Sequence, residues 1–292
     1  MTVLVYILLC LIWGSTWLAI KIGLSAAPPF TTAALRFVLA AATLSIICSL
    51  RCCSYPRDLK TLLRLAYPGF YMYGLSYALV YLAEQYIYSA TAAVLFASYP
   101  FFVVVLSWWL YRTERLGWLA WVGMVLGFLG VVVISLDSLQ ISGDIFMGTV
   151  LMVAASLAAA YGIVLHKHRF AHVDIVVAAN VQMILGALLL AGGALLFEDW
   201  TEFTVSAEAV GSILYLAFVG SVVAFLGYYW LLKRTRLTIV SLITFITPLM
   251  AILIGVSVAE EALTLPILIG AAMILGGVLL VIRKPSASAE PS

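Results

Sequence analysis

Three charged side chains stand inside otherwise apolar runs of the sequence: Lys21, Arg36 and Glu84. Arg36 lies about six residues, or roughly 9 Å, into its run if that run is a helix. A lipid-facing arginine at a helix centre costs roughly 2.5–3.5 kcal/mol, so we expect Arg36 to face the protein interior and bind a partner. Glu84 lies at a compatible depth, and the long stem of Lys21 can reach the membrane surface. The three residues predict a polar cluster that gates a cavity or anchors a substrate carboxylate, with a static ion pair between helices as the alternative.

Tryptophans and tyrosines recur at helical spacing in two runs. The stretch WGSTWLAIK holds Trp13 and Trp17, and Tyr73, Tyr77 and Tyr81 follow at the same spacing of four residues. Such residues share one helix face, and a lipid-facing stripe would not carry so many hydroxyl groups. We expect these side chains to line a cavity, with tight packing at the membrane interface as the alternative for the tryptophans. A further aromatic group either joins the cavity or forms an interfacial belt: Phe225, Tyr228, Tyr229 and Trp230.

Two prolines fall near the middle of their apolar runs, Pro100 and Pro248. A proline inside a helix lacks an N–H group and frees the carbonyl four residues earlier, here at Phe96 and Thr244. We expect both to act as hinges, with static bends as the alternative. The hydroxyl groups beside them would offer hydrogen bonds to a polar substrate at mid-depth: Ser98, Tyr99, Thr244 and Thr247.

Motifs for other chemistry are absent from the sequence. His166, His168 and His172 have no cysteine or carboxylate set at metal-ligand spacing, and we place them in a basic cytoplasmic loop. No phosphate-binding glycine loop, nucleophile elbow or membrane-protease motif occurs. We therefore expect no catalytic residue, metal, cofactor or nucleic-acid partner, and free thiols at the four cysteines.

The composition predicts the elements that must position these residues. Of 292 residues, 65% are hydrophobic and only 10% are charged, which is typical of an integral membrane protein. The apolar runs are each about 20 residues long, enough for a helix to cross a bilayer. We expect an all-α, multi-pass protein with ten transmembrane helices, at 3–23, 30–50, 65–87, 91–111, 117–136, 145–165, 175–197, 209–232, 238–258 and 264–282.

Basic residues alternate between the predicted loops. If the N-terminus is cytoplasmic, the inner loops hold 13 of the 15 Lys and Arg residues, while the outer loops hold none and are acidic. The positive-inside rule therefore predicts that both termini face the cytoplasm, and it places Lys21, Arg36 and Glu84 toward the outer surface.

The two halves of the sequence resemble one another. Residues 93–106 align with 241–254 and 114–134 with 261–281, which pairs Pro100 with Pro248, Gly123 with Gly270 and Gly130 with Gly277. Arg36 falls near Gln182 in a weaker match. A five-helix unit crosses the membrane an odd number of times, so its second copy is inverted. We expect repeats at 1–136 and 137–284 and a disordered cytoplasmic tail at 285–292.

The motifs WGSTWLAIK and PPFTTAALRF, with the mid-helix proline and the glycine-patterned helix that follows it, resemble the EamA family of the drug/metabolite transporter superfamily. The resemblance implies a central cavity formed by helices 1–4 and 6–9, with helices 5 and 10 at the periphery. It also implies movement of small organic solutes, commonly export of amino acids or other metabolites. The second half departs from the pattern, because Ala158 replaces the tryptophan and His166 stands near the lysine position.

The leading functional hypothesis is a secondary transporter or facilitator that exports small organic metabolites, such as amino acids, across the cell inner membrane by alternating access. A polyspecific drug exporter is the alternative, and a polytopic membrane enzyme or sensor is a weaker one. The expected partners are a small-molecule solute and the lipid bilayer. The sequence leaves the oligomeric state open, a monomer included.

Overall fold

The structure is a computed structural model that describes residues 2–112, 118–141, 143–199, 205–235 and 264–282, and single residues at 237, 240, 243, 244, 247, 248, 250, 251 and 254. All of the regular elements in these residues are helices, and none is a strand. The expected all-helical fold is therefore confirmed. Helices overlap nine of the ten predicted runs, and the remaining run, 238–258, lies mostly outside the described residues.

The described residues of the first half form seven α-helices and one π-helical turn. Their bounds are α1 Thr2–Leu24, α2 Pro29–Leu50, α3 Leu59–Gly69, η1 Phe70–Leu75, α4 Ser76–Ala83, α5 Ser89–Phe96, α6 Tyr99–Tyr111 and α7 Trp118–Ile141. Asp58 begins α3, because its carboxylate accepts the backbone N–H of Thr61 at 2.7 Å. This bond lowers the pKa of the Asp58 carboxyl group.

The described part of the second half follows the same order up to its third helix. Its elements are α8 Gly143–Arg169, α9 Ile175–Phe197, α10 Ala207–Ala217, η3 Phe218–Val223, α11 Ala224–Arg234 and α14 Leu265–Ile282. The placement of His166 in a cytoplasmic loop is wrong, because α8 continues to Arg169 and buries His166. Basic side chains in the last turn suit the negative end of the helix dipole, which supports this extension.

A π-helical turn interrupts the third helix of each half. In η1 the backbone N–H of Ser76 donates to the carbonyl of Tyr71, five residues earlier, and in η3 Ala224 donates to Val219 in the same register. The two turns are separated by the same number of residues as Pro100 and Pro248. Such turns often mark functional sites, because the extra residue re-aims the side chains beside it.

The fourth helix is interrupted just before Pro100. Helix α5 ends at Phe96 and α6 begins at Tyr99, so Pro100 lies in the first turn of α6. Proline suits a first turn, because the N–H group that it lacks has no partner there. Pro248 is helical and buried, although 245, 246 and 249 beside it lie outside the described residues.

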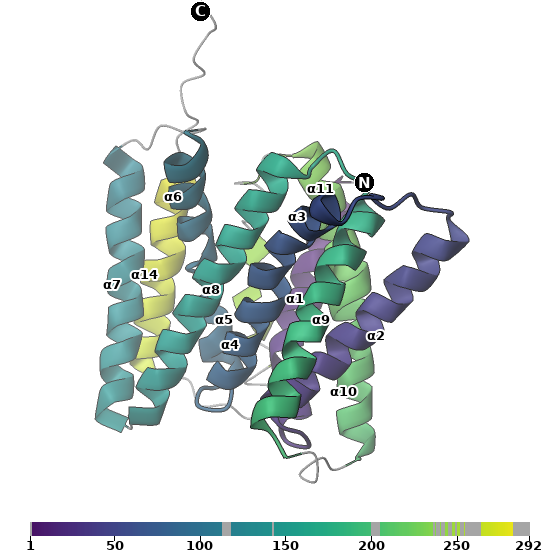
Figure 1. Ribbon diagram of the computed structural model, residues 1–292. Helices are drawn as coiled ribbons and strands as arrows, with labels where there is room; N and C mark the ends of the chain where they lie inside the picture. The colour runs from purple at the N-terminus through teal and green to yellow at the C-terminus, as the bar shows by residue number, and fades with distance from the viewer. Residues whose placement is uncertain are drawn as a thin grey trace, which may run out of the picture.

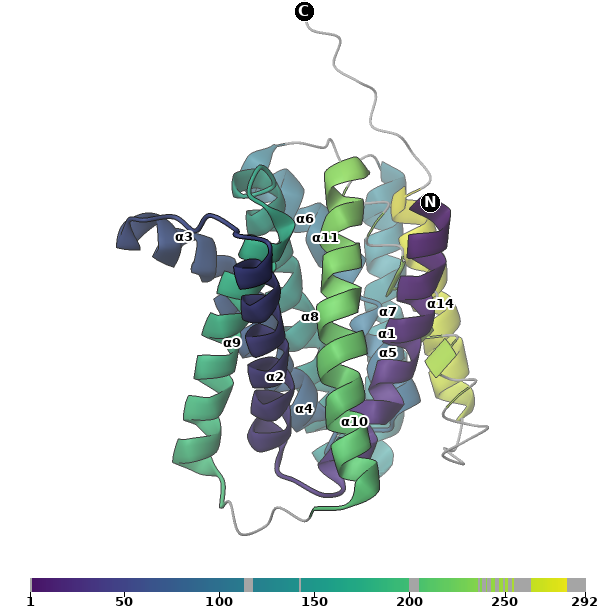
Figure 2. The ribbon, with the colours of Figure 1, turned by 90° about the vertical axis from the view of Figure 1, so that its right-hand side faces the viewer.

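The helices form one bundle. Helices α7 and α14 pack along each other at the left edge of Figure 1, while α2, α9 and α10 lie at the opposite side. In Figure 2, α10 and α11 form one continuous column at the front, and α3 projects to one side. The described helices of the two halves therefore interleave: α2 packs on α9, α4 on α8 and α1 on α10.

Glycines hold α7 and α14 close together. A Cβ atom at Gly130 would lie 2.7 Å from the carbonyl oxygen of Gly270, and one at Gly277 would collide with the carbonyl of Gly123. Small residues allow such close approach of membrane helices. Gly130, the later glycine of α7, meets Gly270, the earlier glycine of α14, and Gly123 meets Gly277. The two helices therefore run antiparallel.

Six helical stretches of the described residues are long and apolar enough to cross a membrane. They are Thr2–Leu24, Pro29–Leu50, Ser89–Tyr111, Gly143–Arg169, Ile175–Phe197 and Ala207–Arg234. The chain is therefore a multi-pass helical membrane protein.

Candidate functional site

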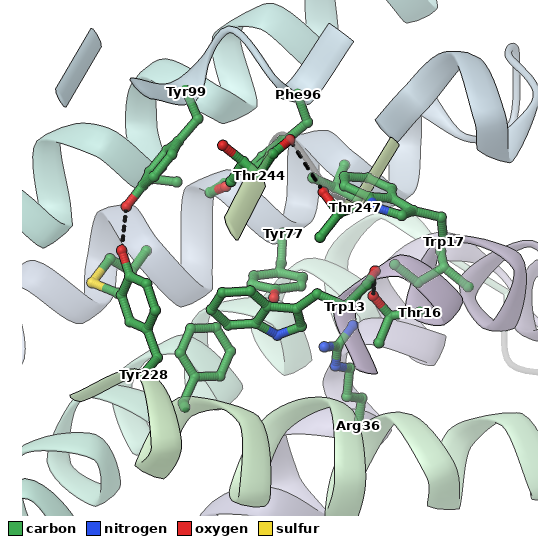
Figure 3. A pocket seen from close by; sticks show the side chains of 16 residues that line it. Trp13, Thr16, Trp17, Arg36, Tyr77, Phe96, Tyr99, Tyr228, Thr244 and Thr247 are labelled. Carbon is green, nitrogen blue, oxygen red and sulfur yellow. Dashed lines mark hydrogen bonds between the residues drawn. The ribbon is translucent and has the colours of Figure 1, made fainter. Parts of the chain in front are cut away.

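A cavity of about 90 Å³ lies at the centre of the bundle (Figure 3). Its walls come from α1, α2, η1, α4, α5, α6, α8 and α11, with Thr244 and Thr247 closing one side. This volume is smaller than that of pockets that hold a drug-sized ligand, which are roughly 300–1,000 Å³. The cavity is lined by Trp13, Thr16, Trp17, Ile20, Arg36, Met72, Ser76, Tyr77, Val80, Phe96, Tyr99, Ala159, Phe225, Tyr228, Thr244 and Thr247.

Aromatic rings from both halves form most of the wall. Trp13 of α1 packs on Phe225 and Tyr228 of α11, with ring centroids 5.4 and 5.1 Å apart. Trp17 packs on Phe96 at 5.4 Å, at the end of the interrupted helix. Tilted and edge-on contacts of this kind are the favoured aromatic geometries. The wall therefore offers flat apolar surfaces to a ligand.

Hydroxyl groups supply the polar part of the wall. The Tyr99 and Tyr228 hydroxyls share a hydrogen bond of 2.8 Å between α6 and α11, and Thr247 donates to the carbonyl of Thr244 at 3.3 Å (Figure 3). Tyr77 lines the cavity, and so do Phe225 and Tyr228. The sequence alone did not assign the last two to a cavity, because interfacial aromatic belts have the same composition.

Three residues expected at the cavity lie behind its wall. Tyr73 is fully buried and packs edge-on against Phe225 at 4.8 Å. Tyr81 is also fully buried, outside the lining. Ser98 joins the interrupted helix to α8 through a 2.9 Å hydrogen bond with the Ser156 hydroxyl.

Arg36 reaches from α2 into the cavity wall and is only 1% exposed. Its Nε atom donates to the Ser221 hydroxyl at 2.9 Å, and Nη2 donates to the carbonyl of Gly220 at 3.3 Å. Both acceptors belong to the π-helical turn η3 of the second half. The guanidinium carbon lies 4.7 Å from the ring centroid of Tyr77, a cation–π contact.

Lys21 and Glu84 meet at one end of the bundle. The Lys21 ammonium donates to the backbone carbonyl of Glu84 at 2.5 Å and to that of Ile87 at 3.0 Å. Glu84 is fully buried at the C-terminal end of α4, the helix whose Tyr77 ring contacts the Arg36 guanidinium. The structure thus brings the three charged residues into one region, with Lys21 bound to the end of α4.

A second polar cluster was not found by sequence reasoning. The Tyr229 hydroxyl donates to the Gln182 side-chain carbonyl at 2.6 Å, and the Gln182 amide donates to the carbonyl of Leu65 at 3.1 Å. The same amide nitrogen lies 3.1 Å from His166 Nδ1, and the His166 ring stacks on Tyr229 at 4.3 Å. Only the weak alignment of Gln182 with Arg36 pointed to this position.

Glu198, at the end of α9, caps the start of α2. Its carboxylate accepts the backbone N–H groups of Phe30 at 2.5 Å and Thr31 at 2.7 Å, and the Thr31 hydroxyl at 2.8 Å. Helix α2 has no side-chain cap of its own, whereas Asp174 caps α9 locally through the N–H of Val176. A carboxylate at a helix N-terminus is favourable, so Glu198 ties the two halves together.

No group of three or more His, Cys, Asp or Glu residues that could hold a metal occurs within the described ranges. The four cysteines are free.

Apolar helices surround a cavity whose wall comes from both halves of the chain, an arrangement that membrane transporters share. The model of the EamA-like transporter family matches residues 1–136 and 146–283, and the chain belongs to this family.

Several relatives match over most of their length. The chain is 26% identical to the uncharacterized transporter YoaV of Bacillus subtilis, with 92% of each chain covered. It is 28% identical to the uncharacterized inner membrane transporter YedA of Escherichia coli K12, over 88% of this chain and 82% of that one. A crystal structure with 21% identity has the same fold, with a TM-score of 0.71 over 96% of this chain and 97% of the other.

Proposed function

We propose that the protein is a secondary transporter or facilitator that exports small organic metabolites, such as amino acids, across the cell inner membrane by alternating access. The central cavity carries this proposal, because both halves of the chain contribute to its wall. A site shared between two halves can open to either side when the halves move against one another.

The proposed architecture has ten crossings, repeats at 1–136 and 137–284 in inverted orientation, and both termini in the cytoplasm, with a tail at 285–292. One observation supports the repeat, and a second supports its inversion. The π-helical turns η1 and η3 occupy equivalent places in the two halves. The sequence aligns Gly123 with Gly270 and Gly130 with Gly277, and in the structure Gly130 contacts Gly270 while Gly277 contacts Gly123. A two-fold axis perpendicular to the two antiparallel helices requires this pair of contacts.

In the proposed cycle, contacts at the two ends of the cavity break in turn. Three contacts close the outer end in this proposal. Lys21 binds the end of α4, Arg36 binds η3, and Glu198 caps α2. At the inner end, Gln182 links α9 to α3 and Tyr229. The small cavity volume fits a state in which both ends are closed.

The remaining candidate residues take roles in the same cycle. Pro100 and Pro248 are the proposed hinges, and the interruption between α5 and α6 supports this role for Pro100. We assign substrate contact to Trp13, Trp17, Tyr77, Tyr99, Thr244 and Thr247, which line the cavity, and support of its wall to Tyr73, Tyr81 and Ser98.

A polyspecific drug exporter is the second candidate, because the aromatic wall also suits apolar drugs. The two candidates separate in proteoliposomes loaded with amino acids, aromatic acids or cationic dyes. We expect saturable efflux of a metabolite that is reduced by Trp13→Ala. Efflux of dyes alone would favour the drug exporter, and no efflux of any solute would contradict transport by this chain.

A further inference from the structure

We propose that the cavity binds an organic monocarboxylate with a flat apolar body, and that Arg36 holds its carboxylate group. This inference names the substrate class of the proposed transporter and rests on that function. It also narrows the choice among metabolites, since it favours a simple acid over a zwitterionic amino acid or an amine.

Unsatisfied donors are the first observation. Arg36 Nη1, Trp13 Nε1 and Trp17 Nε1 are buried and have no hydrogen-bond partner among the described residues. All three side chains line the cavity, and Figure 3 shows the Arg36 guanidinium pointing toward Trp13 and Thr16. Buried donors without partners are unfavourable, so an acceptor-rich ligand would stabilise them. A carboxylate offers two oxygens that accept only, and arginine is the side chain best matched to it.

The charge balance is the second observation. Among the described residues that line the cavity, Arg36 is charged and the others are neutral. Within the described part of the wall there is no Asp or Glu. The site can therefore neutralise one negative charge on a ligand, and it offers no carboxylate to a ligand ammonium group.

The shape of the wall fixes the other end of the ligand. Beyond Arg36, the rings of Trp13, Tyr77, Phe225 and Tyr228 surround the cavity. The ring plane of Trp13 is inclined at 61° to that of Phe225 and at 55° to that of Tyr228. The edge of one ring therefore faces the plane of its neighbour. A planar ring or branched alkyl group packs well among such surfaces.

Three probes with the same ring and different charge test the inference: phenylacetate, phenylacetamide and phenethylamine. Calorimetric titration of the purified protein should show that phenylacetate binds at least about tenfold more tightly than the amide or the amine. Arg36→Gln should remove this preference and Arg36→Lys should keep part of it. Arg51→Gln, the same change at the exposed far end of α2, is the matched control and should leave the preference unchanged.

Equal or tighter binding of the amide or the amine would overturn the inference, and so would tighter binding of phenylalanine than of phenylacetate. If Arg36→Gln does not yield folded protein, the ranking of the probes on the unaltered protein decides the question. Flux measurements in proteoliposomes, corrected for protein-free liposomes, separate the two proposals. Flux of other solutes without preference for the acid would overturn the substrate class alone, whereas tight binding of the acid without flux of any solute would overturn the transport function alone.

Discussion

Arg36 and Ser221 join the two halves of the chain through a buried hydrogen bond of 2.9 Å between Nε and the hydroxyl oxygen. The same hydroxyl donates to the carbonyl of Leu216, five residues earlier, which follows the register of the π-helical turn. The turn thus presents to the arginine a serine and a backbone carbonyl. Arg36 can remain charged inside the bundle because these groups replace part of its hydration.

Ser221→Ala should destabilise the protein by about 1.5–3 kcal/mol, because it leaves a buried cation with one bond fewer. Thermal unfolding in detergent measures the change. Ser212→Ala is the matched control, since that buried hydroxyl donates to the carbonyl of Ala209 in its own helix. Equal stability of the two variants would show that the bond to Arg36 contributes nothing.

Gly130→Ala and Gly277→Ala should each lower the unfolding temperature, because the new Cβ atom would collide with a backbone carbonyl of the facing helix. Gly192→Ala in α9 is the control, because apart from the nearby backbone of its own helix nothing lies within 4 Å of the position that its new Cβ atom would take. Alanine also favours a helix over glycine by roughly 1 kcal/mol. A loss of stability in the control equal to that of the other two would contradict the close packing of α7 and α14.

Glu198→Gln should cost about 0.5–2 kcal/mol, the usual range for loss of a helix cap, because the neutral amide interacts less well with the start of α2. Glu208→Gln, an exposed carboxylate in the first turn of α10, should have a smaller effect. Unfolding curves of both variants at the same pH provide the comparison. A larger effect at Glu208 would refute the role of Glu198 as a link between the halves.

Tyr229→Phe should slow transport and lower stability, because it removes the hydroxyl that donates to Gln182 and meets Tyr73 at 3.0 Å. We expect a stability loss of about 1–3 kcal/mol for the buried groups left without a partner. Tyr86→Phe, at a partly exposed site, controls for loss of a hydroxyl group. Transport and unfolding equal to those of the control would exclude the Gln182 cluster from the cycle.

Pro100→Ala should reduce turnover more than ligand binding, because alanine allows α5 and α6 to join into one stiffer helix. Flux and calorimetric titration on the same preparation separate the two quantities. Unchanged flux in Pro100→Ala, Pro248→Ala and the double variant would reduce both prolines to packing features.

The sequence predicted the elements of this fold better than the contacts between them. Hydropathy identified the helices because membrane spans need long apolar runs, and the cost of a lipid-facing cation correctly placed Arg36 in the interior. Its partners could not be predicted, because Ser221 lies far away in sequence and reaches Arg36 from a π-helical turn. Tyr73 and Tyr77 show the same limit. Their spacing of four residues predicted one shared helix face, yet of the two Tyr77 lines the cavity and Tyr73 does not. Tyr73 lies in the π-helical turn η1, which changes the helical spacing.

Accessibility of the cavity from each side of the membrane tests the alternating-access account most directly. Thr16→Cys places a thiol in the cavity wall, in a chain whose Cys10, Cys48, Cys52 and Cys53 are replaced by alanine or serine. A membrane-impermeant maleimide, applied separately to right-side-out and inside-out vesicles, should label Thr16→Cys from both sides. Adding Glu198→Gln should speed labelling from the outside and slow it from the inside, because weakening the outer contacts shifts the population toward outward-open states. Labelling from one side only, or rates that change in the same direction on both sides, would contradict alternating access.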